Sequence, residues 1–263
     1  MDFDDAFANA AYITDGDSYP DKWANQARSF RQQALCELDI PYGEGARQKY
    51  DLFHPPRLAK GVVVFVHGGY WLRFDKSFWS HLAAGPLAHG WAVAMPSYDL
   101  CPAVDIAQIG EQISRAIDAI STRVLGPIRL VGHSAGGQLV ARMASPATTA
   151  PWSGRVAGVV PVSPVADLTD LMQTSMNADL KITPAEAKSE SPVFLPAPQI
   201  PVKIWVGAQE RPVFIQQAKS LGSAWGCALT IEPGKHHFDV IEALSAPSSA
   251  LTHAVVGLDE VCI

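Results

Sequence analysis

The sequence is poor in cysteine and in positive charge. Its cysteines form no C-x-x-C pair and lie far apart, at Cys36, Cys101, Cys227 and Cys262. Scattered cysteines of this kind predict free thiols in a reducing cytoplasm rather than a disulfide framework. There are 20 Lys and Arg residues against 26 Asp and Glu residues, which gives a net charge of −6. That balance argues against nucleic acid or an anionic membrane surface as a partner.

Long apolar runs and metal-ligand motifs are missing as well. No apolar run approaches the roughly 20 residues that span a bilayer. The acidic first five residues, MDFDD, lack the basic-then-apolar pattern of a signal peptide. The chain has no H-E-x-x-H or H-x-H-x-D motif for a metal. We therefore expect a cytoplasmic protein that needs neither a metal ion nor an organic cofactor and does not bind a membrane.

The chain does contain short apolar segments that alternate with helical patterns. An isoleucine stripe over 106–120 keeps helical spacing, and Asp105 with Gln108 is placed like a capping box. Strands that alternate with helices predict an α/β fold with a mostly parallel central sheet and helices on both faces. The expected strands cover 62–66, 91–95, 128–131, 156–162, 202–206 and 228–231.

Two segments fall outside this alternation within a single expected domain, 1–263. Residues 1–38 are polar and helical in pattern. The stretch from Asp21 to Ala34 has no strong apolar face apart from Trp23, Phe30 and Leu35, so we expect an arm on the surface. Residues 163–200 are rich in proline around short helical patterns. An insertion of this kind predicts a small lid over the edge of the sheet.

A serine between glycines follows the third of these strands. Gly132-His133-Ser134-Ala135-Gly136 matches the G-x-S-x-G pattern of a nucleophile elbow. A serine at such a tight strand-to-helix turn has a strained backbone, so Gly132 and Gly136 must lack side chains where strand and helix nearly touch. The pattern predicts that the Ser134 hydroxyl is exposed at the edge of the sheet, with the Ala135 amide beside it.

A second glycine-rich turn follows the buried strand at 62–66. His67-Gly68-Gly69-Tyr70-Trp71 offers backbone amides that can approach a ligand closely. Backbone donors aimed at a developing oxyanion lower the barrier of acyl transfer by a few kcal/mol each. We expect the amides of Gly69, Tyr70 and Ala135 to form such an oxyanion hole.

These motifs resemble those of the kynurenine formamidases (arylformamidases) in the α/β-hydrolase superfamily, which also contains esterases and lipases. The likeness rests on His67-Gly68-Gly69-Tyr70-Trp71 and extends over most of the chain, through segments 40–43, 50–55, 97–102, 207–214 and 237–239. The resemblance implies an α/β-hydrolase fold with a Ser-acid-His triad in that chain order. The family commonly uses Asp as its acid, whereas this chain offers Glu210.

The base and the acid remain to be chosen from several candidates. A serine nucleophile needs a histidine base, and the base needs an orienting carboxylate. Adjacent His236 and His237 follow the last expected strand, and the residues alone do not choose between them; the resemblance selects His237, which precedes Phe-Asp. For the acid, Glu210 is favoured over Asp167 by its place after the strand at 202–206 and by the resemblance. Asp239 lies only two residues from His237 and would need an awkward turn to reach its Nδ1.

The expected activity is hydrolysis of a small acyl amide or ester by Ser134, His237 and Glu210. The resemblance implies an aryl formamide such as N-formylkynurenine, and aromatic Tyr70 and Trp71 are expected to contact it. A small-acyl carboxylesterase is the close alternative. A catalytically silent binding module of the same fold is another, although such a module would usually have lost one of the three residues. The only expected ligand is a small-molecule acyl substrate, and the sequence leaves a homodimer open.

Overall fold

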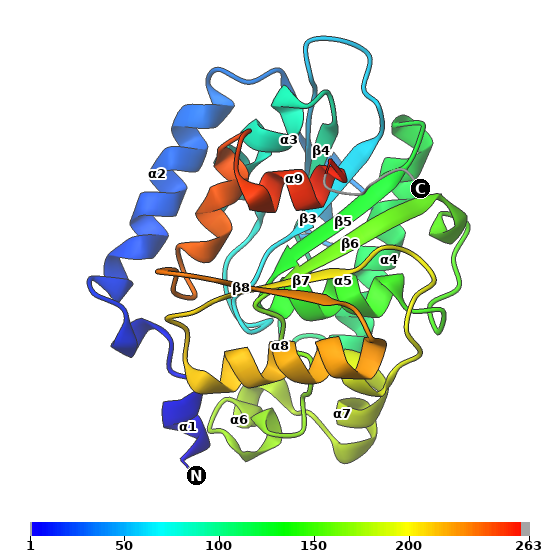
Figure 1. The fold of residues 1–263 in the computed structure, drawn as a ribbon. Helices are drawn as coiled ribbons and strands as arrows, with labels where there is room; N and C mark the ends of the chain where they lie inside the picture. Colours follow the sequence, from blue (N-terminus) through cyan, green and yellow to red (C-terminus); the bar gives the residue numbers. More distant parts are fainter. Residues whose placement is uncertain (1, 259–263) are drawn as a thin grey trace.

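The computed structural model describes residues 2–258, and within them eight strands form one sheet (Figure 1). The strands lie in the order β1-β2-β4-β3-β5-β6-β7-β8. All neighbours from β4 to β8 in this order run parallel, whereas β1 and β2 pair antiparallel with each other and β2 with β4. The strand bounds are β1 (Cys36–Pro41), β2 (Lys49–Phe53), β3 (Val62–Val66), β4 (Ala92–Pro96), β5 (Ile128–His133), β6 (Val156–Val162), β7 (Lys203–Gly207) and β8 (Ala228–Glu232).

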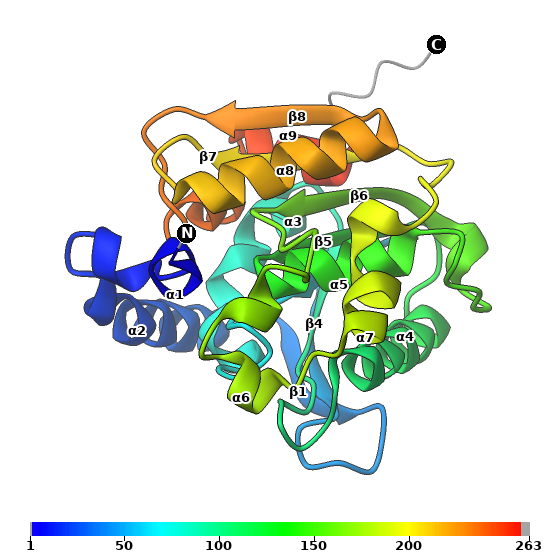
Figure 2. The same ribbon diagram turned by 90° about the horizontal axis from the view of Figure 1, so that it is seen from below.

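Helices cover both faces of this sheet, as expected for an α/β fold. Figure 2 shows α2 and α4 on opposite sides of the strands. Strand β3 explains why, because Val62 and Val64 pack into one hydrophobic core and Val63 and Phe65 into the other. The helix bounds are α1 (Phe3–Ala6), α2 (Tyr19–Arg31), α3 (Ala84–Ala88), α4 (Ile106–Arg123), α5 (Ala135–Ala144), α6 (Asn177–Leu180), α7 (Pro184–Glu190), α8 (Pro212–Trp225) and α9 (Ala250–Val256).

Helix α4 shows how local signals set the bounds of an element. The Asp105 side chain accepts from the Gln108 amide at 2.7 Å, and the Gln108 side chain accepts from the Asp105 amide at 3.0 Å. This is the predicted capping box, and it begins the helix. The isoleucine stripe is fully buried against the sheet at positions 106, 109, 113, 117 and 120.

The expected arm, residues 2–38 in the described chain, is mostly exposed but is anchored to the body of the protein by a few buried residues. Phe7 and Trp23 are each only 2% exposed, and Ala27 is fully buried. Figure 1 shows α1 and α2 along one side of the molecule, with α1 close to the end that carries α6. Phe7 and Trp23 therefore pack against the body of the protein, whereas Tyr12, Leu35 and Leu38 are exposed.

The expected lid, 163–200, contains α6, α7 and short 3-10 turns. Leu168, Leu171 and Leu180 anchor it in the hydrophobic core. Its amide at Ser175 donates to the Asp4 carboxylate at 2.6 Å, so the insertion meets the N-terminal segment. The insertion is therefore packed against its neighbours along much of its length.

Three further expectations concern the cysteines, membrane-spanning helices and metal sites. Cys36, Cys101 and Cys227 are free thiols, while Cys262 lies outside the described residues. Among residues 2–258, no helix is both long and apolar enough to cross a bilayer. Within that same range, no three His, Cys, Asp or Glu side chains come together as a metal site would require.

Candidate active site

Ser134 occupies a strained turn between β5 and α5. Its φ of 58° and ψ of −117° are unfavourable for a residue with a side chain, so the surrounding structure must hold it there. A Cβ atom on Gly132 would lie 2.1 Å from the carbonyl oxygen of Gly136, and one on Gly136 would lie 2.0 Å from that of Val66. Both glycines are therefore sterically required, as the elbow pattern predicts.

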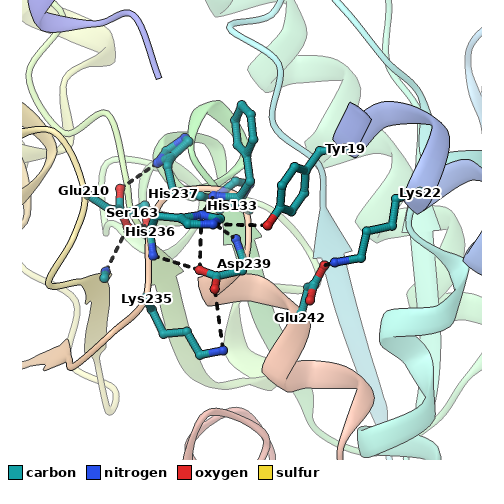
Figure 3. Close-up of polar contacts among 12 residues, drawn as sticks. Tyr19, Lys22, His133, Ser163, Glu210, Lys235, His236, His237, Asp239 and Glu242 are labelled. Atoms are coloured by element: carbon teal, nitrogen blue, oxygen red, sulfur yellow. Dashed lines mark hydrogen bonds and ion pairs between the residues drawn. The ribbon is translucent and has the colours of Figure 1, made fainter. Parts of the chain in front are cut away.

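His237 and Glu210 meet beside this turn. The His237 Nδ1 lies 2.6 Å from the Glu210 Oε2, and both side chains are buried (Figure 3). The second carboxylate oxygen, Oε1, accepts from the Ser163 hydroxyl at 2.5 Å and from the Gly207 amide at 2.8 Å. An ionised carboxylate only accepts, so Nδ1 carries the imidazole proton and Nε2 is left as a base.

The Ser134 hydroxyl and the His237 ring line the same cavity. Among residues 2–258 the hydroxyl makes no hydrogen bond, to His237 or to any other residue. Catalytic hydrogen bonds are often loose before substrate binds and tighten in the Michaelis complex. The arrangement therefore suits a nucleophile that His237 activates once an acyl group is present.

The rival acids and the rival base are engaged elsewhere. Asp167 accepts from the amide and the hydroxyl of Thr169 at 2.9 and 2.6 Å. Asp239 accepts from the His236 amide at 2.7 Å rather than from His237. The His236 Nδ1 accepts from the amides of Phe238 and Asp239 at 3.1 and 3.2 Å, so its ring caps the following turn. Of the candidate pairs, the structure brings together His237 and Glu210.

Two further histidines support the loops of the site. His133 donates through Nε2 to the carbonyl of His237 at 2.8 Å, and burial holds the pKa of His133 well below its usual value. It is therefore neutral and fixes the loop that carries the base. His67 stacks on Tyr98 with ring centroids 4.3 Å apart, and burial lowers its pKa to about 4.

The loop after β3 approaches Ser134 from the other side. A Cβ atom on Gly68 would lie 3.0 Å from the Ser134 Cβ, which leaves no room for a side chain. Gly69, Tyr70 and Trp71 have positive φ values of 113°, 54° and 57°. In residues 2–258 the amides of Gly69 and Tyr70 donate to no backbone acceptor.

Ala135 supplies the third predicted amide. It is the first residue of α5, where amides have no acceptor within the helix. The helix N-terminus also favours negative charge. These three amides are therefore free to donate to an oxyanion.

A cavity of about 580 Å³ contains Ser134 and His237. Its walls include six aromatic side chains, those of Phe7, Trp23, Tyr70, Phe74, Trp79 and Phe238. Trp71 is not among the lining residues, in contrast to the expectation that it contacts substrate. It is fully buried in the core, because the left-handed turn at positions 70 and 71 directs the two neighbouring side chains to different places.

The N-terminal segment supplies walls that sequence reasoning did not predict. Ten lining residues lie between Asp4 and Trp23, whereas the insertion at 163–200 contributes only Ser175 and Met176. Large apolar residues at Phe7 and Trp23 were the available signal. Most of the other lining positions are small, such as Ala8, Ala10 and Ala11, and small residues carry no binding motif.

Comparison with known proteins shows to which family the chain belongs. Residues 63–252 match the model of the alpha/beta hydrolase family. Kynurenine formamidase of Salmo salar is 31% identical over 237 residues, which cover 81% of this chain and 79% of that protein. Kynurenine formamidase of Drosophila melanogaster is 30% identical, with 83% and 80% covered.

Solved structures show the same fold. A crystal structure described as a putative thioesterase from Silicibacter sp. TM1040 is 50% identical with a TM-score of 0.95, over 97% of this chain and 99% of that one. Esterase B from Lactobacillus rhamnosis is 19% identical with a TM-score of 0.66, over 89% and 90%. The chain therefore belongs to the α/β-hydrolase family and is a hydrolase related to the kynurenine formamidases.

Proposed function

We propose that this hydrolase cleaves an aryl formamide such as N-formylkynurenine, giving kynurenine and formate. The observation that carries the proposal is the aromatic cavity over Ser134, of about 580 Å³, in a chain whose relatives include kynurenine formamidases. Aromatic side chains favour an aryl group beside the reacting carbonyl.

In the first half of the proposed reaction, Ser134 attacks the formyl carbon. His237 Nε2 takes the serine proton, and Glu210 stabilises the resulting imidazolium through the 2.6 Å bond to Nδ1. The carbonyl oxygen becomes an oxyanion that accepts from the amides of Gly69, Tyr70 and Ala135.

In the second half, the tetrahedral intermediate collapses and the C–N bond breaks. His237 gives its proton to the leaving arylamine, which is a poor leaving group without it. Water, activated by the same histidine, then releases formate from the acyl-serine. No residue beyond those at the carboxyl ends of the strands is needed for these steps.

Charges at the cavity also suit the leaving group of this substrate. Kynurenine is an α-amino acid and carries both an ammonium and a carboxylate. Arg73 and Asp17 both line the cavity and are exposed, so each could meet the opposite charge of such a head group. A neutral ester would gain nothing from this pair.

A small-acyl ester or thioester is the second candidate substrate. It is favoured by the structure that is 50% identical and is described as a putative thioesterase. The same serine, base and oxyanion donors would serve for that reaction, and an ester needs less help with its leaving group. A silent binding module is disfavoured, because Ser134, His237 and Glu210 are all present and the last two are hydrogen bonded.

The deciding experiment compares substrates on one enzyme preparation. Kynurenine absorbance follows deformylation, while nitrophenol release follows p-nitrophenyl acetate, butyrate and octanoate, and a small acyl thioester completes the panel. We expect kcat/KM to be highest for N-formylkynurenine and to collapse for acyl chains longer than butyrate. Ester or thioester turnover without deformylation would select the second candidate. Inactivity on the whole panel would contradict both.

A further inference from the structure

The oxyanion loop adopts a conformation that its own sequence does not favour. Tyr70 and Trp71 are consecutive residues with side chains at φ values of 54° and 57°. Left-handed residues of this kind persist only where surrounding contacts hold them. The backbone bond from Cys101 to the Trp71 carbonyl, at 2.9 Å, and the buried indole hold Trp71. Tyr70, whose amide is an oxyanion donor, needs a separate anchor.

That anchor lies in the N-terminal segment. The Tyr70 hydroxyl donates to the Phe7 carbonyl at 2.7 Å. Its only proton is thereby used, so the hydroxyl oxygen accepts from the Asn9 side chain, whose Nδ2 lies 3.3 Å away. Asn9 is 6% exposed, and its other amide atom, Oδ1, is buried with no partner in the described chain. Asn9 is thus directed toward Tyr70, although this leaves its second polar atom unsatisfied.

The same segment also reaches the loop that carries the base. The Tyr19 hydroxyl lies 3.1 Å from His236 Nε2, on the residue next to His237 (Figure 3). The Tyr19 ring packs edge-on against the His236 ring, with centroids 5.5 Å apart. Through Nδ1, His236 caps the turn that follows His237. An ion pair between Lys22 and Glu242, at 2.7 Å, joins the two segments nearby.

An apolar contact links the two ends of this arrangement. Phe7, whose carbonyl holds Tyr70, packs edge-on against Phe214 with centroids 5.8 Å apart. Phe214 in turn lies 4.3 Å from the His237 ring. The oxyanion loop is therefore in direct contact with the N-terminal segment, and His237 is linked to the same segment through Phe214.

We propose that residues 3–31 are a clamp that holds the oxyanion loop and the His237 loop in register. The positioning residues are Tyr70, on the oxyanion loop, and Tyr19, on the clamp. Both tyrosines act through their hydroxyl groups. The Tyr70 hydroxyl keeps the Tyr70 amide aligned with the oxyanion. The Tyr19 hydroxyl holds His236 and thereby fixes the position of His237. The clamp serves any acyl substrate, so the inference does not depend on the proposed formamide.

The first test removes the Tyr70 hydroxyl and keeps the ring. Tyr70→Phe should lower kcat by about tenfold with little change in KM, because a misplaced oxyanion donor weakens binding of the transition state only. Phosphonylation of Ser134 by a small fluorophosphonate needs the same donors and should slow by a similar factor. That reaction uses no acyl substrate, so it reports on the clamp even if the substrate proposal fails.

Tyr12→Phe is the matched control. Tyr12 belongs to the same segment, but its hydroxyl bonds to the Asp5 carboxylate and reaches neither the oxyanion loop nor the His237 loop. Its ring packs on Arg211, next to Glu210, and phenylalanine keeps that ring. This variant should leave the phosphonylation rate unchanged. A Tyr70→Phe enzyme with a lower Tm but an unchanged phosphonylation rate would overturn the proposal, as would equal losses in the two variants.

The second test addresses the loop of the base. Tyr19→Phe should lower kcat by about threefold, a smaller loss because His236 keeps its bonds to the backbone. His236→Asn can retain an acceptor for those backbone amides but cannot reach Tyr19, so it should match Tyr19→Phe, while His236→Ala should lose more. If Tyr19→Phe and His236→Asn both keep full kcat, the clamp does not extend to the base.

Discussion

The loops at the carboxyl ends of the strands and the N-terminal segment both line the cavity, but they differ in how their sequences determine their structures. The loops carry motifs because their backbone is strained, and only glycine fits where β5 and α5 approach. The segment from Asp4 to Trp23 forms much of the cavity wall with alanines, backbone and two buried aromatic residues. Chemistry is thus encoded locally in this chain, whereas the shape of the substrate site is not.

The largest expected effect lies in the loops. Ser134→Ala should reduce turnover by about a million-fold, since no other group can attack the acyl carbon. A fluorophosphonate probe should label the wild-type chain at Ser134 and leave the variant unlabelled. Labelling at another residue, or substantial activity in the variant, would show that the elbow is not the source of the nucleophile.

The adjacent histidines should differ by orders of magnitude. His237→Ala should approach the Ser134→Ala loss, because the base and the nucleophile act as one unit. His236→Ala should stay within about tenfold of wild type, since His236 only positions the loop. Steady-state kcat/KM for both variants measures the difference. Equal losses would mean that the two rings cannot be assigned separate roles.

Substitution of the proposed acid, Glu210, should give the next largest loss of activity, and Asp167 provides the control. Glu210→Gln should lower kcat by about 10⁴-fold, because the amide no longer stabilises the imidazolium and can favour the wrong tautomer. Asp167→Asn should have little effect on kcat, as its carboxylate bonds to Thr169. A larger loss in Asp167→Asn than in Glu210→Gln would transfer the role to Asp167.

Substitutions in the cavity wall should act on KM instead. Trp23→Phe should raise KM by about fivefold with kcat nearly unchanged, because it removes apolar contact with the bound aryl group. Met176→Leu, in the insertion, conserves volume and should change KM much less. Initial rates over a range of substrate concentrations separate the two parameters. If Trp23→Phe lowered kcat as much as the loop variants do, the cavity wall and the loops would not have separate roles in binding and catalysis.

The smallest effect concerns stability in acid. Burial lowers the pKa of His67 and of His81 to about 4, against about 6.5 in an unfolded chain. Between these values the unfolded chain binds protons that the folded chain does not, so stability is full above about pH 6.5 and falls as the pH drops toward 4. At pH 5 each residue costs about 2 kcal/mol.

His81 offers the cleaner test, because it lies outside the cavity and both of its ring nitrogens are buried with no partner in the described chain. Urea unfolding of His81→Leu at pH 7.5 and 5 should show about 2 kcal/mol less loss on acidification than wild type. Its kcat at pH 7.5 should not change. An unaltered pH dependence would mean that His81 is not the acid-sensitive group.

The sequence predicted the parallel part of the sheet well, because its strands are continuous apolar runs buried on both faces. Strand β1 escaped prediction because CELDIP sits at the edge of the sheet with most of its residues exposed, and it shows no apolar run. The antiparallel strand β2 follows a short loop and was read only as part of a family likeness.

At the site, the motifs led to predictions for the residues whose type the proposed chemistry demands. The meeting of His237 and Glu210 follows from strand order, since β7 and β8 are parallel neighbours and their carboxyl ends lie together. Trp71 was placed wrongly, because the sequence does not reveal the left-handed backbone at positions 70 and 71 and hence which of the two side chains faces the cavity. The role of the N-terminal segment in the cavity could not be predicted either, because the residues that it contacts lie far away in the sequence.

Those distant contacts bear on the order in which the molecule is assembled. Tyr19 and His236 are 217 residues apart, and Lys22 and Glu242 are 220 apart. Contacts of such separation close the largest loops and form slowly relative to local ones. A nascent chain exposes residues 3–31 first but can seat them only after β8 and the His237 loop exist. During refolding, activity should therefore return after the sheet has formed, which makes catalysis a reporter of the last step of folding.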